Sequence, residues 1–203
     1  MVQIIPNISQ GTGDNARIGD QIRLQSLLIR GYIKLDINTS GASVSDLSAV
    51  YCRLMVLSLK TKQNYTDASS SATPLSNLLK KGGTTTSFSG VLSDIYAPVN
   101  TDLFTVHAER RFYLNQSMLQ NFNSTTNAIV PIDIKNTVKF FRIPLKVKGK
   151  LIKYDSGISG GVLPTNYGAF LVLGYSFLNG ASPDTLSMRV GMQFDTIMNY
   201  EDM

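Results

Sequence analysis

The residues whose types and spacing suggest chemistry most clearly are cations in residues 137–154. Apolar side chains occupy alternate positions of this stretch, and the opposite positions carry Arg142, Lys146, Lys148 and Lys150. Cations that repeat at strand period can follow a phosphate backbone, in contacts that are salt-sensitive and independent of base sequence. The alternative is a solvated strand face, or an edge on which lysines oppose aggregation. The stretch is a candidate nucleic-acid-binding face.

A second candidate for phosphate chemistry is the glycine pair in Gly11-Thr12-Gly13. A phosphate-binding loop needs a preceding strand, a Lys-Ser/Thr pair and a following helix. Here no lysine follows the glycines, and the next element has strand period. We interpret these glycines as part of a flexible or turning arm.

His107, the single histidine, lies in residues 103–114, LFTVHAERRFYL, which alternate between apolar and polar side chains. The alternation predicts a polar face on which His107 stands beside Glu109 and Arg111. The opposite face is predicted to comprise Phe104, Val106, Ala108, Arg110, Phe112 and Leu114. A Ser-His-acid triad can form from distant residues, but no GxSxG motif is present. A polar ladder at a surface or interface is favoured, and a hydrolase remains the third hypothesis.

Cys52 is the single cysteine, so the chain forms no internal disulfide and no CxxC metal site. Together with the single histidine, this count excludes most zinc centres and multi-histidine catalysis. Cys52 lies in an apolar run and is predicted to be a small core residue. The carboxylates are scattered along the sequence. Two of them could still lie close together in the fold, as glycoside hydrolysis requires, but the sequence does not show such a pair. We expect no enzyme activity, no cofactor and no metal.

The 203 residues suit one domain or two small ones, with 43% apolar and only 16% charged residues. The net charge is +5 and the pI is near 9.3, but no run of five like charges occurs. The chain begins without the features of a signal peptide. No apolar stretch approaches the ~20 residues needed to span a bilayer. We expect a protein without membrane association.

Alternation of apolar and polar residues, the pattern of a β-strand, dominates the chain. The apolar phase of residues 22–37 changes after Ser26, which predicts a β-bulge or strand break near Ser26–Leu28. Residues 49–60 are almost continuously apolar, as in a strand covered on both faces. Residues 168–177 are apolar throughout, and residues 186–200 alternate most regularly of all.

Helical signals are confined to one place, residues 74–82, where Thr73 or Pro74 begins a short predicted helix and Gly82-Gly83 ends it. Polar loops are expected on both sides of it, and Pro144 indicates a strand edge or bend. Strands without βα alternation, joined by long loops, favour a Greek-key or jelly-roll sandwich. The predicted fold is all-β: an eight-stranded antiparallel jelly-roll sandwich with one short helix in a loop.

Two segments carry a family resemblance. QGTGDNARIGDQIRLQSLLIRGYI resembles the entry into the first jelly-roll strand of capsid proteins from circular Rep-encoding single-stranded DNA viruses (circovirus, nanovirus and geminivirus types). In those proteins a polar arm with an R-x-G-D-x-I pattern precedes a strand of this kind. The C-terminal GYSFLNGASPDTLSMRVGMQFDTIMNYED is similar to their long alternating last strand. The similarity in strand order and length covers nearly the whole chain.

The resemblance implies an N-terminal arm, residues 1–19, and a jelly-roll shell domain, residues 20–203. It implies a viral coat protein that self-assembles, without catalysis, into an icosahedral T=1 shell of about 60 identical subunits around a single-stranded DNA genome. It also implies location in the virion and, during assembly, in the host cell and its nucleus. Arg17 and Arg23, with the face from Arg142 to Lys150, are then expected to face the shell interior and bind DNA.

One feature departs from the family pattern. Such proteins usually begin with an arginine-rich arm, whereas residues 1–16 contain no Lys or Arg. The departure leaves shell formation untouched and weakens the case for direct DNA binding. The alternative function is a β-sandwich module that binds carbohydrate or another ligand. Such modules usually present aromatic side chains, especially Trp, and this chain has no Trp.

Overall fold

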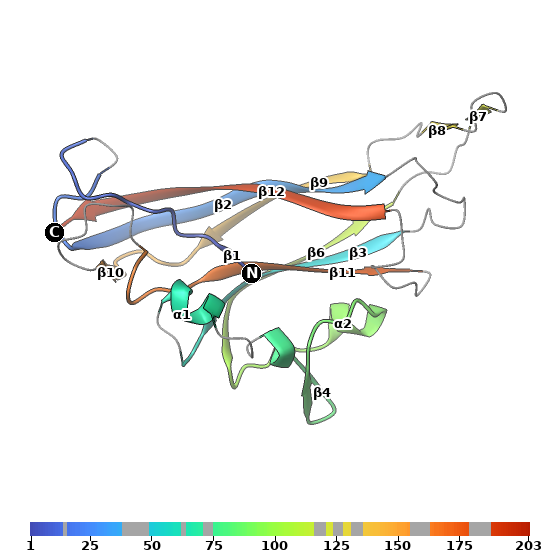
Figure 1. Cartoon of the computed structure of the whole chain (residues 1–203), viewed down its shortest axis with the longest axis horizontal. Coiled ribbons are helices and arrows are strands. Elements are labelled where there is room, and N and C mark those ends of the chain that lie inside the picture. Colours follow the sequence, from blue (N-terminus) through green and yellow to red (C-terminus); the bar gives the residue numbers. More distant parts are fainter. Residues whose placement is uncertain are drawn as a thin grey trace.

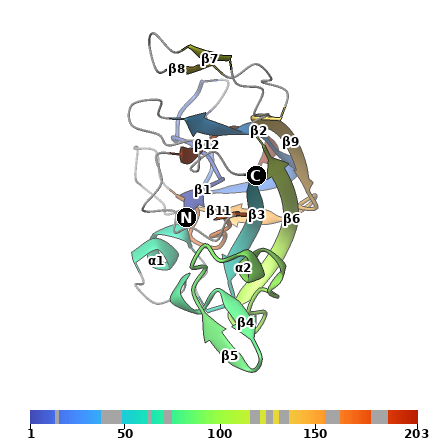
Figure 2. The same ribbon diagram turned by 90° about the vertical axis from the view of Figure 1, so that its right-hand side faces the viewer.

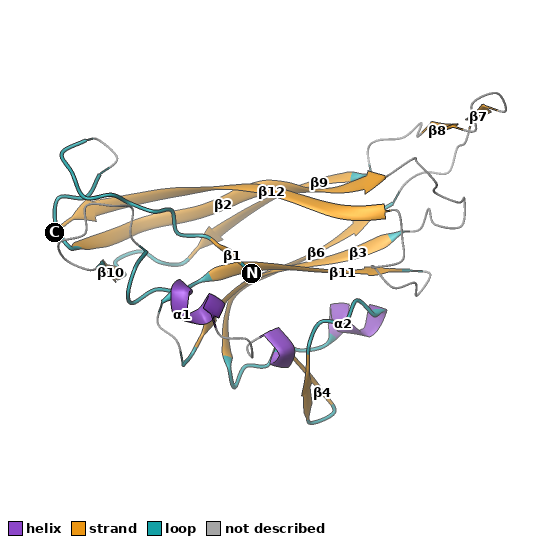
Figure 3. Ribbon diagram, in the orientation of Figure 1, coloured by secondary structure: helices purple, strands orange, loops and turns teal. Residues whose placement is uncertain are grey.

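Two antiparallel β-sheets stack face to face to form the body of the molecule, as the computed structural model shows (Figure 1). The structure describes residues 1–13, 16–37, 49–61, 64–70, 75–115, 121–123, 128–130, 136–154, 163–178 and 188–203. Its secondary structure is almost entirely strand and loop, with only short helical turns (Figure 3).

The first sheet is organised around β2 (Gln21–Ile37). Along one edge, β2 pairs with β12 (Met188–Asp202) over nearly its whole length. Along the other edge it pairs with β9 (Val138–Leu145) and then with β10 (Leu151–Lys153). Residues far apart in the sequence therefore form one continuous layer.

The second sheet has the order β1-β11-β3-β6. Its strands are β1 (Val2–Gln3), β11 (Phe170–Phe177), β3 (Val50–Leu59) and β6 (Phe104–Leu114). β3 pairs with β11 on one side and with β6 on the other. A separate short hairpin joins β7 (Asn121–Asn123) and β8 (Ala128–Val130).

Short elements cover the outer face of the second sheet. They are α1 (Tyr65–Ser70), the 3₁₀ turn η2 (Leu75–Asn77), the hairpin of β4 (Leu79–Lys81) and β5 (Thr84–Thr86), and α2 (Leu92–Tyr96). Figure 2 shows these elements on the side of the second sheet that faces away from β2.

The predicted helix over residues 74–82 is wrong for its described part. Leu75–Asn77 forms only a 3₁₀ turn, and Leu79–Lys81 is a strand. Gly82 and Gly83 have φ of 55° and 91° and form the two-residue turn of the β4–β5 hairpin. The glycines that suggested a helix end instead provide the left-handed conformations that a tight hairpin requires. The prediction of a single helix is also wrong, because α1 and α2 lie where loops were expected.

Burial on both faces explains the apolar sequence of β3. Cys52, Leu54 and Val56 face the core between the two sheets, whereas Met55 and Leu57 face a second core beneath α1, α2 and β4. The prediction of a strand covered on both sides is confirmed. Phe170 on β11 also belongs to the second core, since the same elements cover β11.

The predicted β-bulge in the first long strand is confirmed one residue before its expected position. Asn199 pairs with Ser26 but Tyr200 pairs with Leu24, so Gln25 is the extra residue. The bulge keeps Leu24 in the core before it and Leu27 in the core after it.

A second bulge overturns the predicted faces of residues 103–114. Val56 pairs with Ala108 but Leu57 pairs with Val106, so His107 is the extra residue. Phe104 therefore packs in the second core, on the opposite face from Ala108, Phe112 and Leu114. A strict alternation held over the whole strand missed this change, because a bulge shifts the period by one residue.

The described residues of the predicted N-terminal arm lie along the body. Val2 and Gln3 pair with β11, and Ile4, Ile5 and Ile8 are buried in the core between the sheets. The division into an arm of residues 1–19 and a shell domain of residues 20–203 stays a prediction. The antiparallel, mostly β architecture is confirmed, whereas the eight-stranded jelly-roll order also stays a prediction.

The closest approach in the first sheet generates a test. A Cβ at Gly31 would collide with the carbonyl oxygen of Gln193 and lie 2.7 Å from Cα of Phe194. Gly31→Ala would gain at most ~1 kcal/mol from reduced backbone freedom, but it forces β2 and β12 apart. We expect a net loss of about 1–3 kcal/mol in the free energy of unfolding, measured by urea denaturation.

The matched control is Gly13→Ala, since a Cβ at Gly13 meets nothing within 4 Å. This variant should unfold within about 0.5 kcal/mol of the wild type. If Gly31→Ala were as stable as Gly13→Ala, the tight approach of β2 to β12 would be contradicted.

Candidate functional site

The predicted nucleic-acid-binding residues do not form one surface, and Arg17 lies in the interior. Its side chain is 0% exposed, and Nη1 donates to Gly19 O at 2.6 Å and to Asp20 Oδ1 at 3.3 Å. The guanidinium stacks over the Tyr154 ring, 4.7 Å from its centroid. Burial raises the pKa of Tyr154 to about 12, despite the opposing charge of Arg17. Enclosed in this way, Arg17 is not part of a surface for nucleic acid, contrary to its predicted role.

Arg23 and Arg142 both lie on the exposed outer face of the first sheet. Arg23 on β2 is paired with Glu201 of β12, so an acidic residue lies directly opposite it in the sheet. Arg142 on β9 stands opposite Arg30 of β2, and Arg30 is 3.4 Å from Asp195 of β12. Arg142 itself has no acidic partner among the described residues, so its charge faces solvent.

The three predicted lysines divide into two groups. Lys146 and Lys148 are exposed in the connection that follows β9. Gly149, with φ of 81°, then turns the chain back, and the Lys150 Nζ lies 4.0 Å from the centre of the Tyr167 ring. The even spacing in the sequence predicted one face, but β9 ends at Leu145 and the turn redirects Lys150.

The pairing of β2 with β9 creates an aromatic pair that sequence reasoning missed. Phe140 is 79% exposed, and its ring lies edge-on to Tyr32 at a centroid distance of 6.0 Å. Tyr32 also donates to Gln193 Oε1 at 2.5 Å. The register that brings Tyr32 beside Phe140 is a tertiary property with no signal in either segment alone.

A second cluster of chemically capable groups surrounds His107. Ser58 Oγ is 2.9 Å from His107 Nε2, and the His107 ring is edge-on to Tyr167 at 6.2 Å. The His107 side chain is exposed, but partial desolvation by its neighbours lowers its pKa, and the charge of Lys150 lowers it further. Burial raises the pKa of Tyr167 to about 12 and lowers that of Lys150. The cluster is therefore electropositive whenever Lys150 is charged.

Glu109 does not stand beside His107 as the alternation predicted. It lies on the other face of β6, where its carboxylate accepts from Arg53 at 3.0 Å and from Arg111 at 2.7 Å. Ser58 and His107 make the first contact of a nucleophilic pair, but no described carboxylate bonds to the imidazole to complete a triad.

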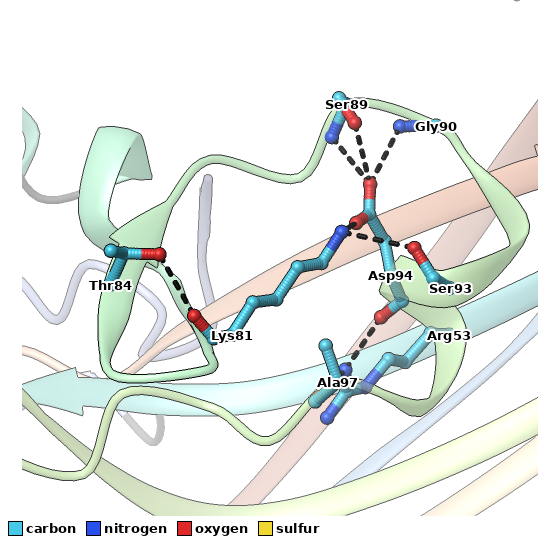
Figure 4. A network of polar contacts seen from close by, with 8 residues as sticks. All are labelled: Arg53, Lys81, Thr84, Ser89, Gly90, Ser93, Asp94 and Ala97. Carbon is cyan, nitrogen blue, oxygen red and sulfur yellow. Dashed lines mark hydrogen bonds and ion pairs between the residues drawn. The ribbon is translucent and has the colours of Figure 1, made fainter.

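The buried carboxylate of Asp94 on α2 is the centre of a network of polar contacts (Figure 4). Asp94 Oδ2 accepts from the backbone N and the hydroxyl of Ser89, at 2.7 and 2.9 Å, and from the Gly90 N at 3.1 Å. The other oxygen forms an ion pair with Lys81, which also donates to Ser93 Oγ. Burial alone would raise the pKa of Asp94, but the bonds from Lys81 and Ser89 outweigh it and hold the pKa below its ordinary value.

Arg53 fastens the same segment to the second sheet. Its side chain is 1% exposed, and Nη1 donates to the carbonyl oxygens of Asp94 and Ala97 at 2.9 and 2.5 Å. Glu109 balances its charge from the adjacent strand β6. The network connects β3, β4, α2 and β6, and its partners are protein groups, so it is a structural clamp rather than a ligand site.

A cavity of about 750 Å³ opens beside β11, between the β4–β5 region and the edge of the second sheet. Its lining includes Leu75, Phe88, Leu173, Gly174 and Met192. The Phe88 ring packs directly on Gly174, where a Cβ would collide with it. The cavity is mostly apolar and is a candidate site for a small ligand.

Cys52 is buried, and burial raises the pKa of its thiol to about 12, so it is held as an unreactive core thiol. In the part of the chain that the structure describes, no three His, Cys, Asp or Glu side chains gather as metal ligands. Among the helices of the same residues, none is long and apolar enough to cross a membrane.

No protein-family model matches the chain, and no curated protein matches it either.

The Asp94 clamp leads to a stability prediction. In Asp94→Asn the amide must point its NH₂ at either Lys81 or the N–H donors of Ser89 and Gly90, which leaves donors facing each other. We expect a loss of about 2–4 kcal/mol in the free energy of unfolding at pH 7, measured by denaturant titration. The matched control is Asp102→Asn, because Asp102 also pairs with a lysine but is 72% exposed. It should destabilise the protein far less than Asp94→Asn does, because solvent screens an exposed ion pair.

The sign of the pH dependence follows from the lowered pKa of Asp94. The contribution of its carboxylate is complete above the ordinary pKa of 3.8 and is lost as the pH falls through the lower folded value. The gap between the wild type and Asp94→Asn should therefore narrow below about pH 4. A gap that stays constant down to pH 2, or equal effects of the two substitutions, would contradict the clamp.

Proposed function

We propose that this chain is a viral coat protein, a jelly-roll subunit that self-assembles into a closed icosahedral shell around single-stranded DNA. The observation that carries the proposal is the position and pairing of β2. This strand begins directly after Arg17-Ile-Gly-Asp20, the segment that resembles the family, and pairs with the last strand, β12. The second long strand likewise pairs with the penultimate one, β3 with β11. Such nested pairing of first with last strands supports a rolled-up antiparallel sandwich.

The surface supports a second part of the proposal, contact with nucleic acid. Exposed cations on the outer face of the first sheet and in the connection after it include Arg142, Lys146 and Lys148. The aromatic pair of Phe140 and Tyr32 lies on the same outer face. Cations provide sequence-independent attraction to phosphates, and an exposed ring provides a stacking surface for unpaired bases. On this view the first sheet faces the genome.

The assembly prediction is tested on the purified full chain. Size-exclusion chromatography with light scattering, combined with negative-stain microscopy over a range of salt concentrations, should reveal closed particles of uniform diameter. Heterologous contacts that close by symmetry produce such particles, with mass far above one 22.2 kDa subunit. A protein that stays monomeric under every ionic condition would refute the coat-protein proposal.

The nucleic-acid prediction uses Lys146→Gln with Lys148→Gln. Binding to a single-stranded oligonucleotide, measured by fluorescence anisotropy, should weaken about equally for all sequences. The slope of log K against log salt should fall in magnitude by about 1.4, because two phosphate contacts are removed. The control pair, Lys60→Gln with Lys80→Gln, changes the net charge equally in another part of the chain. Equal losses for both pairs would indicate a general charge effect and contradict a defined DNA-binding face.

The cavity beside β11 favours one second candidate, a β-sandwich module that binds a small ligand. Its apolar lining suits an apolar ligand better than a sugar. Specific binding of a glycan or small apolar molecule by a protein that never assembles would favour this candidate over a coat protein.

A further inference from the structure

Four side chains from four separate segments meet at one end of the sandwich, beside the bulge in β6. Ser58 comes from β3, His107 from β6, Lys150 from the turn before β10, and Tyr167 from the segment before β11. Ser58 Oγ is 2.9 Å from His107 Nε2, while Lys150 Nζ lies 4.0 Å from the centre of the Tyr167 ring. The His107 ring is edge-on to the same tyrosine ring, with 6.2 Å between the two ring centroids. The Tyr167 ring therefore contacts both basic side chains, those of His107 and Lys150.

Two backbone irregularities produce this arrangement. The bulge at His107 sends its side chain to the Ser58 side of the sheet, away from Glu109. Gly149, in the left-handed region at φ 81°, turns the chain so that Lys150 reaches Tyr167 rather than continuing the line of Lys148. Irregularities of this kind often redirect a side chain toward a functional site.

The cluster contains hydrogen-bond donors but no carboxylate among the described residues. Within the described residues, neither His107 nor Lys150 forms an ion pair with a carboxylate, and the Tyr167 hydroxyl is buried without a hydrogen-bond partner. Among the described residues, the titratable groups that act on His107 are Lys150, through its charge, and Tyr167, through its ring, and β3 contributes the Ser58 hydroxyl. The charge of Lys150 lowers the pKa of His107, so a negative ligand between the two groups would stabilise the protonated imidazole.

We propose that Ser58, His107 and Lys150 form a binding site for a phosphate-type oxyanion. The ammonium of Lys150 and the protonated imidazole provide charge-assisted donors, and the Ser58 hydroxyl provides a third. A hydrolytic role suits the same groups less well. Lys150 lowers the proton affinity of His107 and so weakens it as a base, and no described acid orients its ring.

The single histidine makes the site directly measurable. The rate of hydrogen–deuterium exchange at Cε1 of His107, followed by mass spectrometry against pH, reports its pKa in a monomer or an assembly alike. The test is therefore independent of shell formation. Three conditions are compared at equal ionic strength, because salt screening alone also relieves the repulsion from Lys150. They are sodium chloride, inorganic phosphate, and an oligothymidylate without terminal phosphates.

We expect phosphate to raise the pKa of His107 by about 0.5–1 unit relative to chloride. Lys150→Gln should raise the pKa in chloride and abolish the response to phosphate, whereas Lys150→Arg should keep the response. Ser58→Ala should reduce the response. The matched control is Lys148→Gln, an exposed lysine two residues away, which should respond as the wild type does.

The response of the His107 pKa to each anion either supports or overturns the proposal. A rise with phosphate alone assigns the site to free phosphate, and a rise with the oligonucleotide assigns it to a phosphodiester of nucleic acid. No rise with either anion, or an equal rise in wild type and Lys150→Gln, overturns the proposal. Folding of each variant is checked by circular dichroism, and Lys150→Arg preserves the charge if Lys150→Gln fails to fold.

Discussion

The pairing of β2 with β12 organises the first sheet. It joins the first long strand to the last and exposes the other edge of β2 to β9 and β10. Gly31 permits the close approach of the two strands at their middle, where any side chain would meet the backbone of β12. The bulge at Gln25 then keeps both halves of β2 facing the same core. One strand thereby determines the first sheet and one wall of the core.

The second sheet achieves stability differently, because both of its faces are covered. The core between the sheets uses one face of β3, and the outer core beneath α1, α2 and β4 uses the other. A covering layer made of such short elements has little cooperative helix stability of its own. Buried polar bonds compensate: Arg53 holds the carbonyls of α2, and Asp94 gathers the donors of Ser89, Gly90 and Lys81. The charges are paired, so their mutual attraction and hydrogen bonds offset the cost of removing them from water.

Cations in this protein serve three different ends, and their surroundings decide which. Arg17 and Arg53 are enclosed and bind backbone carbonyls. Arg142, Lys146 and Lys148 remain in solvent, where they can attract a polyanion. Lys150 is also exposed, but its ammonium lies over the Tyr167 ring and close enough to His107 to lower the pKa of the imidazole. Residue type and spacing alone do not separate these roles, since burial and partners set the energy of each charge.

Four properties could be predicted from the sequence: the strand-rich class, the burial of β3 on both faces, the core role of Cys52 and the presence of a bulge in β2. These properties follow from local periodicity, because the face that a side chain occupies depends on its neighbours along the strand. Four others became apparent only in the folded protein: the burial of Arg17, the bulge that moves His107 away from Glu109, the turn that redirects Lys150, and the contact of Tyr32 with Phe140. Each of these depends on register between distant strands, or on one extra residue in one of them. Register is fixed by the pairing of whole strands in the sheet, and no short stretch of sequence contains that information.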